Sequence, residues 1–385
     1  MKRHGYLWEQ LVSFENIFVA FRKAIRGKGY RPYALQFIQN LEHNLIELQH
    51  SLITKSYQPG GYRTFFIYEP KKRMISEAPF TDRLMHHCLI NVIGPFFETT
   101  FIRQSYANQI GKGTHRAIRD VQNAMRLHSY VLHCDIRKYF PSIDHRILKG
   151  LIRRKIKDPD VLWLIDLIID SSNPQEPVID CFPNADPLTP DDPSASDGDP
   201  LKPADDEPLS PDADPPALLE RRKGLPIGNL TSQFFANVYL NGFDHFAKEM
   251  LGCRFYARYV DDIIVVDSDK HYLWEVCREM ERYLESLRLR FHHGKCHIRP
   301  VAIGFRFLGQ MIYPERRLLP QSNVRCFMRR MRKFQRLYAS GKMSLDQIRP
   351  SLQSWLGHAR QAHTLALRRS LLEKVQFRRN IQRSI

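Results

Sequence analysis

Two adjacent carboxylates, Asp261 and Asp262, interrupt an otherwise apolar stretch of the chain. The runs on either side are Phe255-Tyr-Ala-Arg-Tyr-Val and Ile263-Ile-Val-Val, and both are rich in the β-branched and aromatic residues that favour strands. Carboxylates beside a core are costly unless they are hydrogen-bonded or coordinate a metal ion. A lone Asp-Asp pair is better explained as an ordinary hairpin turn. A metal site therefore requires a third carboxylate from elsewhere in the chain.

That third carboxylate is available at Asp135, which follows a second apolar strand pattern over residues 129–136. Mg²⁺ prefers hard oxygen ligands and is usually held by few protein carboxylates together with substrate phosphates. In two-metal phosphoryl transfer, one ion activates the attacking hydroxyl and the other stabilises the leaving oxygen. The residues predict a centre for two Mg²⁺ ions, for which Mn²⁺ can substitute, at Asp135, Asp261 and Asp262.

Several motifs together resemble those of the reverse transcriptases. Tyr259-Val-Asp-Asp262 matches the Y-x-D-D motif of that family, and residues 135–140 match the motif with its first metal ligand. The resemblance covers residues 55–365 and implies an RNA-directed DNA polymerase, a nucleotidyltransferase that binds RNA and DNA. It adds Ile136 to the metal-binding residues and places Phe140 where the family keeps an aromatic gate against ribose 2′-hydroxyls.

The same resemblance implies further roles, in order along the chain. Lys72 and Arg73 would hold the triphosphate of the incoming dNTP, and Lys295 would protonate the leaving group. The turn at Phe307, Leu308 and Gly309 resembles the primer grip.

One motif departs from most reverse transcriptases, which carry L-P-Q-G-x-x-x-S-P before the catalytic hairpin. This chain reads Leu225-Pro-Ile-Gly-Asn-Leu-Thr-Ser-Gln233, so Ile227 replaces glutamine and Gln233 replaces proline. The variant is typical of diversity-generating retroelements, whose enzymes copy a template-repeat RNA with selective errors at adenines. In the family this position, with Gly228 beside it, lines the nascent base pair. An amide can hydrogen-bond there and Ile227 cannot, so mutagenesis is expected; the alternative is that Ile227 only packs at a strand end.

Two other classes of protein are alternatives. A reverse transcriptase of the group II intron or retron kind would copy accurately, but the chain ends soon after the expected thumb, so we expect no maturase extension or endonuclease domain. A non-catalytic RNA-binding protein on a polymerase scaffold is disfavoured because all three carboxylates and Phe140 are present. The expected partners are template RNA, the RNA–cDNA duplex, dNTPs and, by the resemblance, a small basic accessory protein of the retroelement.

Charge is distributed unevenly along the 385 residues, whose formal net charge is +17. From Arg316 onward, seventeen lysines and arginines face two acids, a net charge of +15. Such a segment predicts a phosphate-rich partner bound through salt-sensitive contacts. Residues 322–339 combine an apolar stripe with a basic one, and we predict that the basic stripe lies along a duplex rather than serving only as a solvated face: Arg325, Arg329, Arg332 and Arg336.

Residues 173–218 have the opposite character, with twelve acids, one lysine and twelve of the 24 prolines of the chain. Such a segment cannot bury enough apolar surface to fold, and we predict that it is disordered. It falls where the reverse transcriptases have a hairpin and is interpreted as an insertion in that hairpin. A tolerated surface insertion is the favoured interpretation; an electrostatic gate that competes with nucleic acid is the alternative.

The pattern of elements predicts an α+β right-hand polymerase with fingers, a palm of antiparallel sheet plus helices, and a helical thumb. Helices are expected over 7–25, 33–53, 83–92, 231–250, 271–289 and 322–339, and strands over 62–68 and 129–136. The expected domains are an N-terminal helical region at 1–54, fingers at 55–128, a palm at 129–310 that contains the insertion, and a basic helical thumb and tail at 311–385.

Seven cysteines are scattered along the chain without any C-x-x-C pair, which disfavours a zinc ribbon or a disulfide framework. His292, His293, Cys296 and His297 could be taken for a metal cluster, but their position between a turn and a strand favours a structural interpretation. Residues 1–10 lack a signal peptide, and no run of about 18 apolar residues is present. We therefore expect a cytoplasmic protein, encoded by a prokaryote or a phage.

Overall fold

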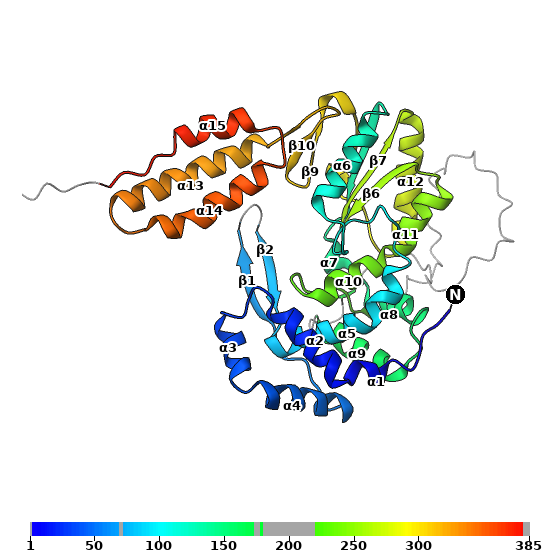
Figure 1. The fold of residues 1–385 in the computed structure, drawn as a ribbon. Helices are drawn as coiled ribbons and strands as arrows, with labels where there is room; N and C mark the ends of the chain where they lie inside the picture. The colour runs from blue at the N-terminus through cyan, green and yellow to red at the C-terminus, as the bar shows by residue number, and fades with distance from the viewer. Residues whose placement is uncertain (1, 69–71, 173–177, 180–219, 380–385) are drawn as a thin grey trace, which may run out of the picture. The chain divides into compact units, whose positions relative to one another are not determined.

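The computed structural model describes residues 2–68, 72–172, 178–179 and 220–379 (Figure 1). The chain folds into two compact units. Unit 1 consists of Met1–Arg103, Asp135–Leu251 and Arg278–Gly294, and unit 2 consists of Gln104–Cys134, Gly252–Cys277 and Lys295–Ile385. The described residues form helices and antiparallel strand pairs, which confirms the α+β class.

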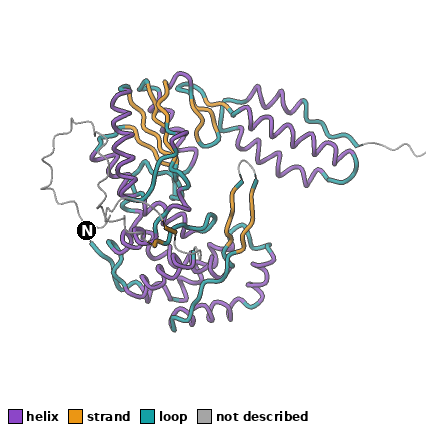
Figure 2. The backbone as a smooth tube through the Cα atoms, turned by 180° about the vertical axis from the view of Figure 1, so that it is seen from behind, coloured by secondary structure: helices purple, strands orange, loops and turns teal. Residues whose placement is uncertain are grey.

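Unit 1 is built mainly from helices, visible as purple coils in Figure 2. Its central helix α5 packs against α1, α2, α3 and α10. The helices of this unit are α1 Trp8–Val12, α2 Phe14–Ile25, α3 Pro32–Gln39, α4 Leu41–Ile53, α5 Phe80–Glu98, α7 Tyr139–Ser142, α8 His145–Arg153, α9 Pro159–Ser171, α10 Leu230–Tyr239, α11 Asn241–His245 and the π-helix η1 Phe246–Met250.

Three of the long helices expected from the sequence are interrupted. The helix expected over 7–25 breaks at Ser13, whose hydroxyl accepts a hydrogen bond from the Asn16 N–H (3.2 Å) and caps the start of α2. The helix expected over 33–53 breaks at Asn40, which has the non-helical angles φ −123° and ψ 47°. Within the helix expected over 231–250, α10 ends at Tyr239 and α11 begins at Asn241. Hydrophobic periodicity continues across such breaks, so it does not reveal them.

Two antiparallel strand pairs complete unit 1. Strands β1 (Arg63–Ile67) and β2 (Arg73–Glu77) form a hairpin in which Ile67 pairs with Arg73. Strands β4 (Val178–Ile179) and β5 (Glu220–Arg221) form a shorter ladder. Val178 and Ile179 belong to the segment 173–218 that the sequence predicts to be disordered. The rest of that segment lies outside the described residues.

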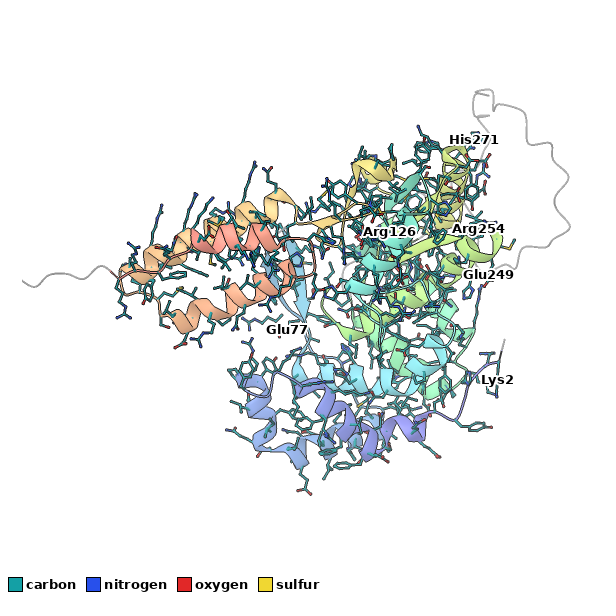
Figure 3. The ribbon with its side chains drawn as sticks, turned by 45° about the horizontal axis from the view of Figure 1, so that its top comes forward. Lys2, Glu77, Arg126, Glu249, Arg254 and His271 are labelled. Carbon is teal, nitrogen blue, oxygen red and sulfur yellow. The ribbon has the colours of Figure 1, made fainter. Side chains whose placement is uncertain are left out.

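Unit 2 contains a four-stranded sheet with the order β6-β7-β3-β8. Helix α6 packs against β6 and β7 (Figure 1). Arg126, labelled in Figure 3, follows α6 and donates from Nε to the Pro314 carbonyl (2.9 Å). The elements that lie wholly or partly in this unit are α6 Thr114–Met125, β3 Tyr130–Asp135, β6 Phe255–Tyr259, β7 Asp262–Asp267, α12 Lys270–Ser286, the 3₁₀ turn η2 His293–Lys295 and β8 His297–Pro300.

A second sheet and three helices form the carboxyl-terminal part of unit 2. Phe327 and Trp355 stack with their ring centroids 3.8 Å apart and join α13 to α14. Ser344 and Gln347 form the capping box expected from the sequence at the start of α14. The elements are η3 Val301–Ile303, β9 Phe305–Phe307, β10 Gln310–Ile312, β11 Arg317–Leu318, α13 Gln321–Ala339, α14 Leu345–Ala359 and α15 Leu365–Glu373. No helix among the described residues is long and apolar enough to cross a membrane.

Candidate active site

The Asp-Asp pair lies in the turn of a tight β-hairpin in unit 2. Strands β6 and β7 pair in antiparallel register up to Tyr259 and Asp262, which leaves Val260 and Asp261 as the two turn residues. Val260 has φ +59°, a left-handed conformation that is an outlier for a β-branched residue. Strain of this kind persists only where the surroundings impose it. Burial raises the pKa of Tyr259, which keeps this phenol neutral.

A buried arginine supports the strained turn. Arg258 is 1% exposed, and its guanidinium donates from Nη1 to the Val260 carbonyl (3.1 Å) and from Nη2 to the Ser105 hydroxyl (3.1 Å). Backbone hydrogen bonds between residues 104–106 and Arg258 join the same segment to β6. Buried charges require such partners. We did not predict this role from the sequence, although an arginine within an apolar strand indicates a buried charge that needs hydrogen-bond partners.

Asp262 contacts a histidine of the neighbouring strand. His133, on β3, places Nε2 3.2 Å from Asp262 Oδ1, and the two side chains are 25% and 30% exposed. The imidazole lies beside two rings of β9, with centroids 5.5 Å from Phe305 and 6.4 Å from Phe307. These rings restrict where the imidazole can move. The sequence signal for His133 is its position two residues before Asp135, because alternate residues of a strand share one face.

The other residues predicted for the metal centre are Asp135 and Ile136, which are adjacent in the chain, and Lys295 is the predicted proton donor. Asp135 is the last residue of β3, and its carbonyl accepts from the His292 N–H (2.8 Å). Ile136 is buried and forms a bridge with Phe291. Lys295 is the last residue of η2 and is half-buried. In the sheet order, β3, which ends at Asp135, is next to β7, which begins at Asp262.

Unit 1 brings together the segments predicted to bind the incoming dNTP. Arg73 begins β2, and Lys72 places Nζ 4.6 Å from the centroid of the Phe66 ring on β1. The N–H of Ser76, on β2, donates to the Ile227 carbonyl (3.1 Å). The loop with the unusual Ile227 is thereby hydrogen-bonded to the strand that begins at Arg73.

Two further residues predicted to border the nucleotide belong to this region: Phe140 is hydrogen-bonded to the loop, and Gly228 follows Ile227 within it. The Leu225 N–H donates to the Phe140 carbonyl (2.9 Å), so Phe140 is tied to the same loop. Gly228 has φ +123°, and a Cβ atom at this position would lie 3.2 Å from Ile75 Cγ2 and 3.6 Å from the Ser76 carbonyl oxygen. Only glycine accepts this backbone without strain. Gln233 lies one turn into α10 and is half-buried.

The turn predicted to be the primer grip is a two-residue hairpin in unit 2. Phe307 pairs with Gln310, and the two residues between them, Leu308 and Gly309, have φ +45° and +83°. Two successive positive φ angles are characteristic of the type I′ turn that suits the twist of a hairpin. A Cβ atom at Gly309 would lie 3.5 Å from His358 Cε1 of α14, so this turn approaches the helical part of the unit.

Helix α13 has the two faces expected from its sequence. Phe327 and Met331 are buried, whereas the predicted basic stripe is exposed. Arg325 donates to Gln321 (3.1 Å) and Arg329 contacts Cys326 Sγ (3.5 Å), and both are uncharged partners. The exposed members of the stripe are Arg325, Arg329, Arg332 and Arg336.

Comparison with known proteins identifies the domain. Residues 212–312 match the family described as "Reverse transcriptase (RNA-dependent DNA polymerase)", and this range contains Ile227, Gly228 and the hairpin with Asp261 and Asp262. Protein YkfC of Escherichia coli (strain K12) is 22% identical over 329 residues, which are 73% of this chain and 76% of YkfC.

Two further relatives match over shorter ranges. The group II intron-encoded protein LtrA of Lactococcus lactis subsp. cremoris is 27% identical over 127 residues, which are 32% of this chain and 21% of LtrA. Nuclear intron maturase 1, mitochondrial, of Arabidopsis thaliana is 28% identical over 92 residues, 24% of this chain and 13% of the maturase. Residues 212–312, which match the reverse transcriptase family, contain the Asp261-Asp262 turn, and with the similarity to LtrA this makes the chain an RNA-directed DNA polymerase, that is, a nucleotidyltransferase.

Proposed function

We propose that this polymerase copies a template-repeat RNA into cDNA with selective errors at adenines, as part of a diversity-generating retroelement. The observation that carries the proposal is that Ile227 occupies the position where most reverse transcriptases carry glutamine. Its carbonyl is hydrogen-bonded to β2, so its backbone is held in place, while its side chain offers no amide to the base pair. The site then has one hydrogen-bonding group fewer with which to discriminate the correct pairing base from an incorrect one.

Asp135, Asp261 and Asp262 are proposed to hold two Mg²⁺ ions. The donor set fits, because carboxylate oxygens are the hard ligands that Mg²⁺ prefers. Asp262 accepts from His133 through Oδ1, and a carboxylate has further lone pairs for a cation. When bound, the ions would activate the primer 3′-hydroxyl and stabilise the leaving oxygen.

The remaining roles belong to side chains of the protein. The primer 3′-hydroxyl attacks the α-phosphate of the dNTP, and pyrophosphate leaves. Lys72 and Arg73 offset the charge of the triphosphate, and Lys295 donates a proton to the leaving pyrophosphate. Phe140 and Gly228 border the sugar and base of the nucleotide. Arg258 acts indirectly, because it holds the turn that presents Asp261. Template RNA, the RNA–cDNA duplex and a small basic accessory protein are the proposed macromolecular partners.

The test is primer extension on a defined RNA template with Mg²⁺ and four dNTPs, followed by deep sequencing of the cDNA. Ile227→Gln restores the amide that most reverse transcriptases carry, and Ile303→Gln, an exposed position of unit 2, controls for a nonspecific effect of the same exchange. We expect wild-type errors concentrated opposite template adenines, a reduction of several-fold in Ile227→Gln, and an unchanged spectrum in Ile303→Gln.

Accurate cDNA from the wild-type enzyme would refute the mutagenic role and leave the polymerase assignment intact. Errors spread evenly over all four template bases would refute the adenine selectivity. An unchanged spectrum in Ile227→Gln would remove Ile227 as the cause.

A faithful polymerase of the group II intron kind is the second candidate. It is favoured by the similarity to LtrA, whose name describes it as group II intron-encoded. This candidate predicts accurate cDNA in the same experiment.

A further inference from the structure

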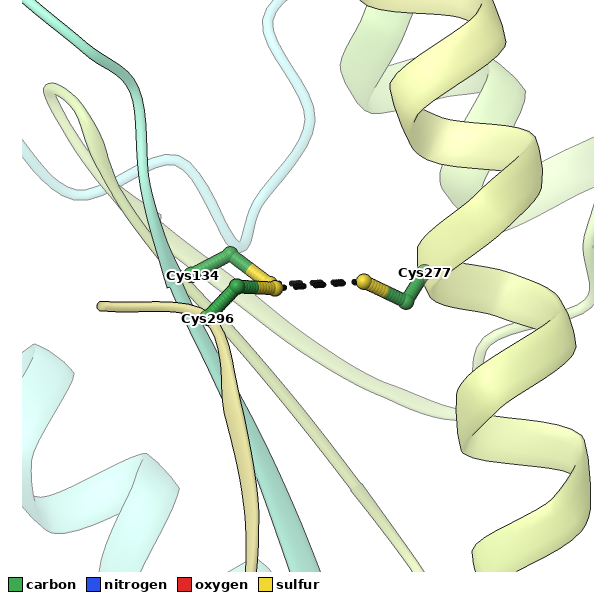
Figure 4. Close-up of side chains that lie close together, drawn as sticks. All are labelled: Cys134, Cys277 and Cys296. Carbon is green, nitrogen blue, oxygen red and sulfur yellow. Dashed lines mark hydrogen bonds between the residues drawn. The ribbon is translucent and has the colours of Figure 1, made fainter. Parts of the chain in front are cut away.

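Three cysteines that are far apart in the sequence lie together in unit 2 (Figure 4). Cys134 belongs to β3, Cys277 to α12, and Cys296 immediately precedes β8. Their sulfur atoms are 2.7 Å (Cys134–Cys296), 3.2 Å (Cys277–Cys296) and 4.0 Å (Cys134–Cys277) apart. Within the described ranges, this is the one group of three or more potential ligands among His, Cys, Asp and Glu with such mutual proximity.

The register of the sheet explains why the sulfur atoms meet. Strands β3 and β8 are antiparallel, and His133 pairs with His297. The same register places Cys134 opposite Cys296, so their side chains point to the same face of the sheet. Cys277 reaches this face from α12, as the contacts between its sulfur and the other two show.

The three cysteine side chains differ in their exposure to solvent. Cys134 is fully buried and Cys277 is 6% exposed, whereas Cys296 is half-buried. Thiols are weak hydrogen-bonding groups, so three of them gain little from facing one another in a core. Apolar side chains would pack such a position more favourably. Packing alone therefore does not explain why three thiols occupy this position.

The sulfur separations suit a tetrahedral metal. With a Zn–S distance of about 2.3 Å, tetrahedral geometry places sulfur ligands about 3.8 Å apart. The observed separations of 2.7 Å, 3.2 Å and 4.0 Å lie on both sides of this value, so movements of about 1 Å or less would accommodate the ion. Thiolate sulfur selects zinc and other thiophilic ions and disfavours Mg²⁺.

We propose that Cys134, Cys277 and Cys296 form a three-thiolate site for a thiophilic divalent cation of the zinc class. The fourth position would be open to water or a small ligand, because Cys296 is the partly exposed member. The ion would replace the thiol protons and crosslink β3, α12 and the start of β8. The site is separate from the carboxylate centre, although Cys134 directly precedes Asp135 and Cys296 directly follows Lys295.

A disulfide between Cys134 and Cys296 is the competing chemistry. It would use two of the three sulfur atoms and would leave the approach of Cys277 unexplained. All three sulfur atoms lie within 4.0 Å of one another, which favours the ion.

The test uses the full-length protein, purified with a reductant and without a chelator. We expect about one Zn²⁺ per chain by mass spectrometry of the metal content. After the metal is removed with a chelator, titration with Co²⁺ should produce sulfur-to-cobalt charge-transfer absorption that saturates at one equivalent and disappears when Zn²⁺ is added. Cys277→Ser and Cys296→Ser should each lose the absorption.

Two controls separate this site from other binding. Cys326→Ser removes an exposed cysteine on α13 and should leave the Co²⁺ spectrum unchanged. Asp261→Asn alters the carboxylate centre and should also leave it unchanged. Zn²⁺ should raise the thermal unfolding midpoint of the wild-type protein but not of Cys277→Ser, which tests the site even if that variant is less stable.

Three outcomes would overturn the proposal. One is a Co²⁺ spectrum without sulfur ligation in the wild-type protein. Another is equal loss of binding in Cys326→Ser. The last is a peptide map of protein purified without a reductant and alkylated before any reduction, in which Cys134 and Cys296 are joined by a disulfide and have lost two hydrogens to an oxidant, which would assign redox chemistry to the cluster instead.

Discussion

Asp144 in unit 1 caps the start of α8 and Asp262 in unit 2 begins β7, yet the surroundings of these two carboxylates are opposite. Asp144 is fully buried, and its Oδ2 accepts from Arg221 (3.2 Å) and Arg288 (2.8 Å). Its Oδ1 accepts two backbone N–H groups at the start of α8. Asp262 is 30% exposed and has His133 at 3.2 Å. A carboxylate whose oxygens are all engaged stabilises structure, whereas a partly exposed one retains capacity for a cation.

The largest expected effect is on catalysis at Asp262. Asp262→Asn removes a charge that would bind the metal ions, so we expect cDNA synthesis to fall by about 10³-fold or more, comparable with the loss of a single electrostatic group from other active sites. Primer extension measures this effect. RNA affinity and the thermal unfolding midpoint should stay near the wild-type values, and a large drop in either would mean that Asp262 has a structural role like that of Asp144.

The converse effect is expected at Asp144. Asp144→Asn keeps a side chain that can cap α8 but removes the buried negative charge that Arg221 and Arg288 both contact, which costs about 3–5 kcal/mol in free energy of unfolding. Denaturant unfolding of the full chain measures this change. Asp269→Asn is the matched control, because Asp269 is an exposed carboxylate that accepts from the N–H groups of His271 (2.8 Å) and Tyr272 (3.2 Å). A similar loss in both variants would contradict the importance of the buried arginines.

His133 extends the comparison, because its imidazole contacts Asp262 at 3.2 Å and is not itself proposed to touch substrate. His133→Leu should reduce activity by about 10–100-fold, the range for a residue that orients a metal ligand. The requirement for Mg²⁺ should shift to higher concentration, whereas a purely structural role would lower stability without changing that requirement. His133→Gln, which keeps a donor, should recover part of the activity.

A smaller effect is expected for the charges of α13. Arg325 and Arg329 are exposed and contact uncharged partners, whereas an arginine of α14 is paired with an acid. Replacing Arg325 and Arg329 by Gln should reduce the dependence of log affinity on log salt by about 1 for each arginine. Binding of an RNA–DNA duplex at several salt concentrations measures this slope. Arg349→Gln on α14 is the control, because Arg349 pairs with Asp346 at 3.2 Å. Equal changes would indicate a nonspecific effect of net charge.

Local patterns were sufficient to predict many elements. The apolar, β-branched runs around Asp261 predicted the two strands of the Asp261-Asp262 hairpin, and the spacing of apolar residues predicted α13 within one residue at its start. The reverse transcriptase motifs predicted the activity that the domain match supports. Helix breaks at Ser13 and Asn40 were missed, because capping and backbone angles at single residues compete with a periodicity that continues across them.

The class of fold, the polymerase motifs and the basic character of the carboxyl-terminal helices can be predicted from the amino-acid sequence. These properties depend on residues that are close together in the chain. Folding in three dimensions is what brings His133 to Asp262, Arg221 and Arg288 to Asp144, and three scattered cysteines to one face of a sheet. Such contacts depend on strand order, register and the packing of a helix, and short-range patterns do not encode which distant partner completes them.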